Sequence, residues 1–118
     1  MNLDALTDVL RRYRFAFATE DDLQVGIDDV LARNGVRFRR EHRLSGADRI
    51  DFLIDGGIGV EVKIGGATAA LTRQVARYAQ HEDITALLVV ASRVRLANLP
   101  LEINGKPLRV LSLLSGVA

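Results

Sequence analysis

The sequence predicts an α/β domain with a central mixed β-sheet flanked by helices. Apolar residues recur at helical spacing before residue 36 and then alternate with polar ones, which is typical of strands. Short glycine-containing turns separate three alternating stretches, as in an antiparallel meander. An alanine-rich helical segment then leads into a continuous apolar run, which indicates a crossover to a buried strand.

Two helices are expected at the start of the chain. Apolar residues at helical spacing predict a short amphipathic helix over residues 3–13. Thr19 can cap a second helix, Asp22 stands where a capping box needs it, and Gly35 follows the last turn. The buried stripe of this helix is expected to contain Leu23, Ile27, Val30 and Leu31.

Strands and one further helix are expected after residue 36. The strands are predicted at 36–43, 49–54 and 58–64, a helix at 67–82, and a buried strand at 85–91. At the end of the chain, residues 101–103 and 108–114 flank Asn104-Gly105, a strong hairpin signal, and form a small terminal β element.

Composition limits the class of protein. The 118 residues suit one domain, 1–118, and 48% hydrophobic content is enough to bury a core. The absence of cysteine excludes disulfides and thiolate zinc sites, so we expect an intracellular, cytoplasmic protein. Charges interrupt the N-terminal segment and the longest apolar run, 86–91, is short, so we expect no signal peptide and no membrane partner.

The third predicted strand carries a carboxylate and an ammonium group on one face. Its apolar residues at 58, 60, 62 and 64 share the opposite face. Glu61 and Lys63 therefore lie on the same side, roughly 7 Å apart along the backbone. In the preceding strand, apolar residues at 50, 52 and 54 leave Asp51 on the other side.

The hairpin register decides whether the two carboxylates meet. A three-residue loop, 55–57, pairs Ile54 with Ile58, and the pairs that follow are Phe52 with Val60, Ile50 with Val62, and Asp51 with Glu61. A two-residue loop would mix polar and apolar side chains on both faces. The pattern therefore predicts that Asp51 and Glu61 oppose each other directly.

Two opposed carboxylates repel each other unless a cation lies between them. Magnesium prefers oxygen ligands and usually takes one or two carboxylates, leaving positions for water and phosphate. Lys63 could then orient an attacking water or neutralise charge on the phosphate. A purely structural pair between Lys63 and Glu61 is the alternative.

This arrangement resembles the PD-(D/E)XK nucleases through Ile50-Asp51-Phe52 and, nine residues later, Glu61-Val62-Lys63. Gln74 and Tyr78 resemble the Gln-x-x-x-Tyr motif of RecB-like members. Glu20 with Gln24 resembles the acidic first-helix motif of virus-type replication-repair nucleases and archaeal Holliday junction resolvases. The resemblance covers roughly residues 19 to 91, and Ile50 stands where the family name has proline.

The resemblance implies a restriction-endonuclease-like core and a nuclease that uses Mg²⁺ or Mn²⁺ to hydrolyse DNA phosphodiester bonds. It implies that Asp51 and Glu61 bind the metal, that the Val62 carbonyl can add a ligand, and that Glu20 joins or supports this shell. The catalytic set would comprise Asp51, Glu61, Lys63, Gln74, Tyr78 and Glu20. Alternatively, Glu20 is a first-turn acid favoured by the helix dipole, and Tyr78 is a half-buried tyrosine with a polar tip.

Arginine clusters predict where DNA would bind. The expected phosphate contacts are Arg37, Arg39, Arg40, Arg43, Arg73 and Arg77. Because phosphate contacts position DNA without reading bases, we expect structure-selective or weakly sequence-specific cutting, by endo- or exonucleolytic action. A solvated strand and helix face would produce the same pattern.

Two other functions are compatible with the sequence: a Holliday-junction resolvase, and a catalytically silent nuclease-fold module that binds DNA or protein. We also expect a homodimer, because the apolar stretch 108–114 exceeds what a small core readily covers.

Overall fold

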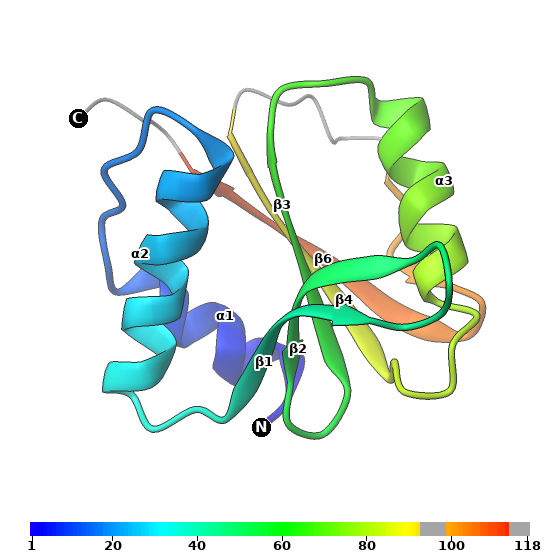
Figure 1. The fold of residues 1–118 in the computed structure, drawn as a ribbon, viewed down its shortest axis with the longest axis horizontal. Coiled ribbons are helices and arrows are strands. Elements are labelled where there is room, and N and C mark those ends of the chain that lie inside the picture. The colour runs from blue at the N-terminus through cyan, green and yellow to red at the C-terminus, as the bar shows by residue number, and fades with distance from the viewer. Residues whose placement is uncertain (93–98, 114–118) are drawn as a thin grey trace.

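The computed structural model describes residues 1–92 and 99–113. Within these ranges a six-stranded sheet has the order β1-β2-β3-β4-β6-β5, with helices on both faces (Figure 1). The strands are β1 (Phe38–Arg43), β2 (Arg49–Ile54), β3 (Ile58–Ile64), β4 (Ala86–Ser92), β5 (Glu102–Ile103) and β6 (Lys106–Leu113). The helices are α1 (Leu3–Arg11), α2 (Glu20–Arg33) and α3 (Thr68–Tyr78). The predicted α/β architecture with a mixed sheet is confirmed.

The sheet is mixed because two kinds of connection build it. Tight turns make β1, β2 and β3 antiparallel, whereas α3 crosses over so that β4 runs parallel to β3. Helices α1 and α2 cover one face and α3 covers the other (Figure 1). None of the helices in the described ranges is long and apolar enough to cross a membrane.

The helix ends follow the local sequence. Asn2 caps α1, and Thr19 and Asp22 form the predicted capping box of α2. α1 ends two residues before the predicted position. α3 is shorter than predicted, because the chain tightens after Tyr78: His81 N–H donates to the Tyr78 carbonyl, three residues back.

The terminal β element differs from the prediction, because it joins the main sheet. β6 lies parallel to β4, and the turn before it has positive φ angles at both Asn104 (50°) and Gly105 (74°), as a type I′ turn requires. The strand begins at Lys106 instead of 108. Pro107 is tolerated there because its neighbour is the two-residue edge strand β5.

β6 also bears on the expected homodimer. Leu108 and Leu111 are buried, and Val110 and Leu113 pack partly buried against the two cores. The apolar side chains of 108–113 are thus used within one chain, and position 114 lies outside the described residues. Self-association stays a prediction without support from this stretch.

β2 does not keep one face throughout. The predicted pairs Ile54–Ile58 and Phe52–Val60 are confirmed, but the pairing ends there. Phe52 and Ile54 pack with α1 and α2, whereas Ile50 packs in the core beneath α3. The prediction that Ile50 opposes Val62 on the same face is therefore wrong. The neighbouring strand is irregular at the same level, since Glu41 has a left-handed φ of 46°.

Gly59 makes room for the displaced Ile50. A Cβ atom at Gly59 would lie 2.4 Å from Ile50 Cδ1, 2.9 Å from Ile84 Cδ1 and 3.0 Å from Leu87 Cδ2. All three side chains belong to the core beneath α3. The absence of a side chain at Gly59 is thus a packing requirement of β3, two residues before Glu61.

We expect Gly59→Ala to destabilise the protein by about 1–3 kcal/mol, because an added methyl group overpacks this core. Urea denaturation measures the change. Gly46→Ala is the matched control, since a Cβ at Gly46 meets nothing within 4 Å. Equal stability of the two variants would contradict the packing argument.

Candidate active site

Asp51 lies where β2 and β3 separate. On the N-terminal side of Phe52, β2 no longer pairs with β3. There the Asp51 side chain replaces a backbone acceptor, because its Oδ2 accepts a hydrogen bond from the Val62 N–H at 2.8 Å. This bond fixes the carboxylate between the two strands. It also satisfies a buried donor that the separating strand no longer pairs.

Glu61 shares this space with Asp51. Its residue surface is only 4% exposed, and its carboxyl group interacts with both the side chain and the backbone of Asp51. Oε1 is buried and finds no hydrogen-bond partner among the described residues. Among the described residues Glu61 forms an ion pair with Lys63, whose Nζ lies 3.9 Å from Glu61 Oε2. The structure thus brings Asp51, Glu61 and Lys63 together.

The proximity of the two carboxyl groups makes ionisation of both unfavourable. Burial, together with the charge of Asp51, raises the pKa of Glu61 to about 8. Burial also raises the pKa of Asp51, against the lowering effect of the Val62 hydrogen bond. Glu61 therefore holds a proton at neutral pH when no cation is bound. We call Asp51 and Glu61 the carboxylate pair.

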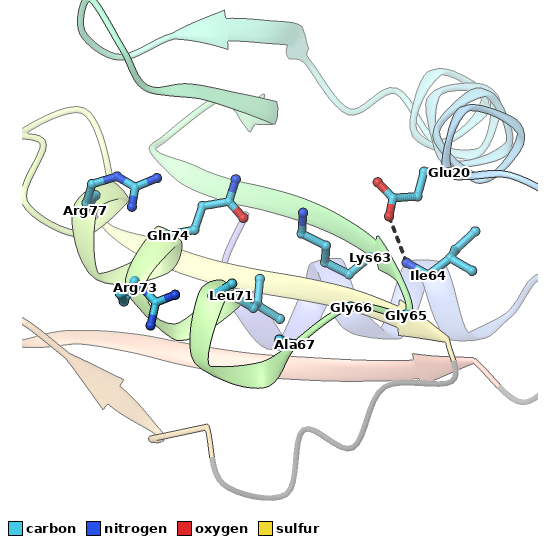
Figure 2. Close-up of a pocket in the computed structure, with 11 residues that line it drawn as sticks. Glu20, Lys63, Ile64, Gly65, Gly66, Ala67, Leu71, Arg73, Gln74 and Arg77 are labelled. Carbon is cyan, nitrogen blue, oxygen red and sulfur yellow. Dashed lines mark hydrogen bonds between the residues drawn. The ribbon is translucent and has the colours of Figure 1, made fainter.

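A cavity of about 610 Å³ lies between α2 and α3, at the end of β3. It is lined by Glu20, Lys63, Ile64, Gly65, Gly66, Ala67, Ala70, Leu71, Arg73, Gln74 and Arg77. Figure 2 shows the side chains of Lys63 and Gln74 pointing the same way, with Glu20 on the α2 side and Arg73 and Arg77 on α3. The cavity can therefore receive an anionic group next to Lys63.

Glu20 lies beside the pair and makes its contact elsewhere. Its Oε2 accepts the Ile64 N–H at 3.1 Å, which ties the first turn of α2 to the end of β3 (Figure 2). Its charge contributes to raising the pKa of Asp51. In the described ranges, no three His, Cys, Asp or Glu side chains are close enough to hold a metal. Glu20 thus supports the site from its edge.

Gln74 and Tyr78 form a chain of hydrogen bonds on α3. Gln74 Nε2 donates to the Tyr78 hydroxyl at 2.8 Å, and that hydroxyl donates to the Arg49 carbonyl at 3.0 Å. Tyr78 is buried, and burial together with the charges of the carboxylate pair raises the pKa of its hydroxyl. Tyr78 therefore anchors the start of β2, two residues before Asp51.

The six predicted arginines do not form one surface. Arg73 and Arg77 line the cavity, whereas Arg37 and Arg39 line a separate hollow near the β2–β3 turn. Arg43 donates to the Gly46 carbonyl at 2.7 Å within its own hairpin. This leaves the two α3 arginines beside the candidate site.

The Arg40 side chain is held by contacts within the protein. Its Nη1 lies 3.3 Å from Asp28 Oδ2, its Nη2 donates to Gln24 Oε1 at 2.9 Å, and its guanidinium lies 5.3 Å from the Phe52 ring centroid. These contacts attach β1 to α2. They also occupy Gln24, which the resemblance paired with Glu20.

The carboxylate pair meets the chemical requirements of a hard divalent cation. Magnesium needs only one or two carboxylates, the remaining positions being filled by water, carbonyl or phosphate oxygens. A cation would offset the repulsion within the pair and give Glu61 Oε1 the partner it lacks among the described residues. The residues present therefore fit such an ion.

Sequence reasoning placed a turn at Gly65-Gly66 but did not assign Asp48, His81 or these glycines to the site. Asp48 is a buried carboxylate that contacts His81 and Arg77. Its position directly before the Arg49-Ile50-Asp51 segment is the one local signal that could have indicated a role. Gly65 and Gly66 both have positive φ angles, 88° and 97°, and lead the chain around the cavity into α3.

No protein-family model matches the chain, and neither the curated proteins nor the solved structures contain a significant match to it.

We expect Glu61→Gln to stabilise the metal-free protein by an amount that grows with pH. The pKa of Glu61 is about 8 in the folded chain and 4.5 as its ordinary value, so folding takes up a proton between these values. The wild-type folded state consequently loses stability as pH rises from 4.5 through about 8, whereas glutamine has no charge to bury.

Melting temperatures from about pH 5 to about pH 9 in EDTA test this. The gap between Glu61→Gln and wild type should widen upward across this range. Glu82→Gln, at an exposed glutamate, should follow wild type throughout. Parallel curves for Glu61→Gln and wild type would show that no carboxyl with a raised pKa is lost.

Proposed function

We propose that this chain is a metal-dependent nuclease with a restriction-endonuclease-like core, which hydrolyses phosphodiester bonds in DNA. One observation carries the proposal: the buried carboxyl group of Glu61 lies against the half-buried carboxyl group of Asp51, and its Oε1 has no partner among the described residues. Lys63, 3.9 Å from Glu61, lines a cavity together with Arg73 and Arg77. Burying such a pair is costly for a protein that gains nothing from it.

Asp51, Glu61 and the Val62 carbonyl would hold Mg²⁺ or Mn²⁺. When bound, the ion supplies Lewis acidity and offsets the negative charge that develops on the phosphoryl oxygens. Glu61 must lose its proton for the ion to bind, so metal affinity should rise with pH. Asp51 is already oriented by the Val62 N–H and needs no rearrangement.

The other residues act on the substrate or hold the strands that carry the site. Lys63 carries a compact ammonium group into the cavity, where it can orient a water molecule or stabilise the non-bridging oxygens of the scissile phosphate. Water adds at phosphorus, the P–O bond to the leaving sugar oxygen breaks, and a phosphomonoester and a hydroxyl result. Glu20 fixes the end of β3 next to Lys63, and Gln74 and Tyr78 hold the start of β2.

The arrangement favours an enzyme that contacts the DNA phosphates over one that recognises a base sequence. Arg73 forms no ion pair with a carboxylate in the part of the chain described, and it faces the same cavity as Lys63. Such groups bind phosphates of any sequence. Cutting is therefore proposed to depend on DNA structure.

We expect Asp51→Asn and Lys63→Ala each to reduce magnesium-dependent cleavage at least about a hundredfold, with DNA affinity largely retained. Asp51→Asn should also abolish metal-induced stabilisation, which reaches about 2.7 kcal/mol at a hundred times Kd in a protein that binds the ion. Asp8→Asn, at an exposed aspartate of α1, is the control.

A panel of single-stranded, duplex, flap and four-way-junction DNA in magnesium or manganese measures the cleavage. Paired symmetric cuts in the junction would identify a Holliday-junction resolvase. Wild-type protein that binds DNA but cleaves nothing, with no thermal shift from either metal, would identify a catalytically silent binding module and overturn the proposal.

A further inference from the structure

A polar cluster joins the β1–β2 turn to the end of α3. Asp48 has one oxygen 3.2 Å from Arg77 Nε and the other 3.1 Å from His81 Nε2. The Asp48 side chain is only 11% exposed, whereas that of Arg77 is 55% exposed. A buried carboxylate with a partner at each oxygen thus holds a largely exposed arginine.

Only one nitrogen of Arg77 is used in this contact. The two terminal nitrogens have no acceptor among the described residues, and the side chain lines the cavity that also receives Lys63 and Arg73. Figure 2 shows the Arg77 guanidinium lying along α3 on the same side as Gln74. The free edge of the guanidinium is the edge that binds phosphate in a forked, two-bond geometry.

The contact through Nε reduces the side-chain entropy that Arg77 loses when it binds a phosphate. A free arginine side chain loses rotamer freedom when it binds a phosphate, and this loss reduces affinity. The hydrogen bond from Arg77 Nε to Asp48 restricts that freedom beforehand, and His81 in turn fixes Asp48 by occupying its second oxygen. The cluster is therefore built to present a preorganised cation.

We propose that Asp48, held by His81, is a positioning residue that presents Arg77 to a backbone phosphate of the DNA. This inference rests on the proposed function and deepens it. The phosphate at Arg77 is distinct from the scissile one beside Lys63, so the substrate is a polynucleotide strand that continues along α3.

Asp48→Asn gives a test in which two explanations predict opposite changes in DNA affinity. If Asp48 were only a negative charge near the DNA, its removal would strengthen binding. If it positions Arg77, its removal should weaken binding about fivefold and lower the slope of log affinity against log salt by up to about 0.9. Fluorescence anisotropy with a mixed-sequence duplex and its single strand, in EDTA at low salt, measures both.

Asp29→Asn is the matched control. Asp29 Oδ2 lies 3.1 Å from Arg33 Nε on the exposed side of α2, so the substitution removes an aspartate–arginine pair of the same kind and the same charge. It should leave affinity unchanged or slightly increased. Asp48→Asn that behaves like Asp29→Asn would overturn the inference.

Arg77 supplies a second variant that does not disturb a buried group. Arg77→Lys keeps the charge but cannot both bind Asp48 through Nε and offer a fork, so binding should again weaken about fivefold. In the Arg77→Gln background, Asp48→Asn should no longer weaken binding. A full Asp48→Asn effect in that background, or wild-type affinity of Arg77→Lys, overturns the inference.

The outcome also separates this inference from the function it rests on. Wild-type protein that cleaves DNA while Asp48→Asn binds with undiminished affinity leaves the nuclease standing and removes the positioning role. Wild-type protein that binds neither DNA probe overturns both.

Discussion

The candidate site depends on one hydrogen bond, from the Val62 N–H to the Asp51 carboxylate. Two neighbouring strands cannot separate inside a protein unless the backbone donors they expose find new acceptors. Asp51 supplies that acceptor with its side chain, so residues 49–51 of β2 can lie apart from β3 without leaving the Val62 amide unsatisfied. The space that opens holds both carboxyl groups.

The same bond sets the electrostatics of the site. It stabilises the charged form of Asp51, and this charge in turn adds to the burial that raises the pKa of Glu61. Lys63 reduces the effect but lies 3.9 Å away and partly in solvent. The folded chain therefore contains a negative centre that its own cation only partly neutralises, which is a fitting starting point for binding a divalent ion.

Local chemistry explains which parts the sequence could predict. The Thr19–Asp22 capping box, the three-residue 55–57 turn and the Phe52–Val60 register each depend on residues close in the chain, and the structure contains all three. The prediction for Ile50 is wrong because strict alternation assumes continuous pairing, whereas β2 pairs with β3 only at residues 52–54. Arg40 looked like a DNA contact because the sequence cannot show that Asp28 and Phe52 would surround it.

The face change within β2 has a consequence for how the fold comes apart. One strand contributes Phe52 and Ile54 to the core under α1 and α2, and Ile50 to the core under α3. Neither core can loosen without pulling on residues that belong to the other, so the two layers are coupled into one cooperative unit. Because Asp51 lies where the strand changes face, we expect the geometry of the carboxylate pair to be lost only when both layers unfold together.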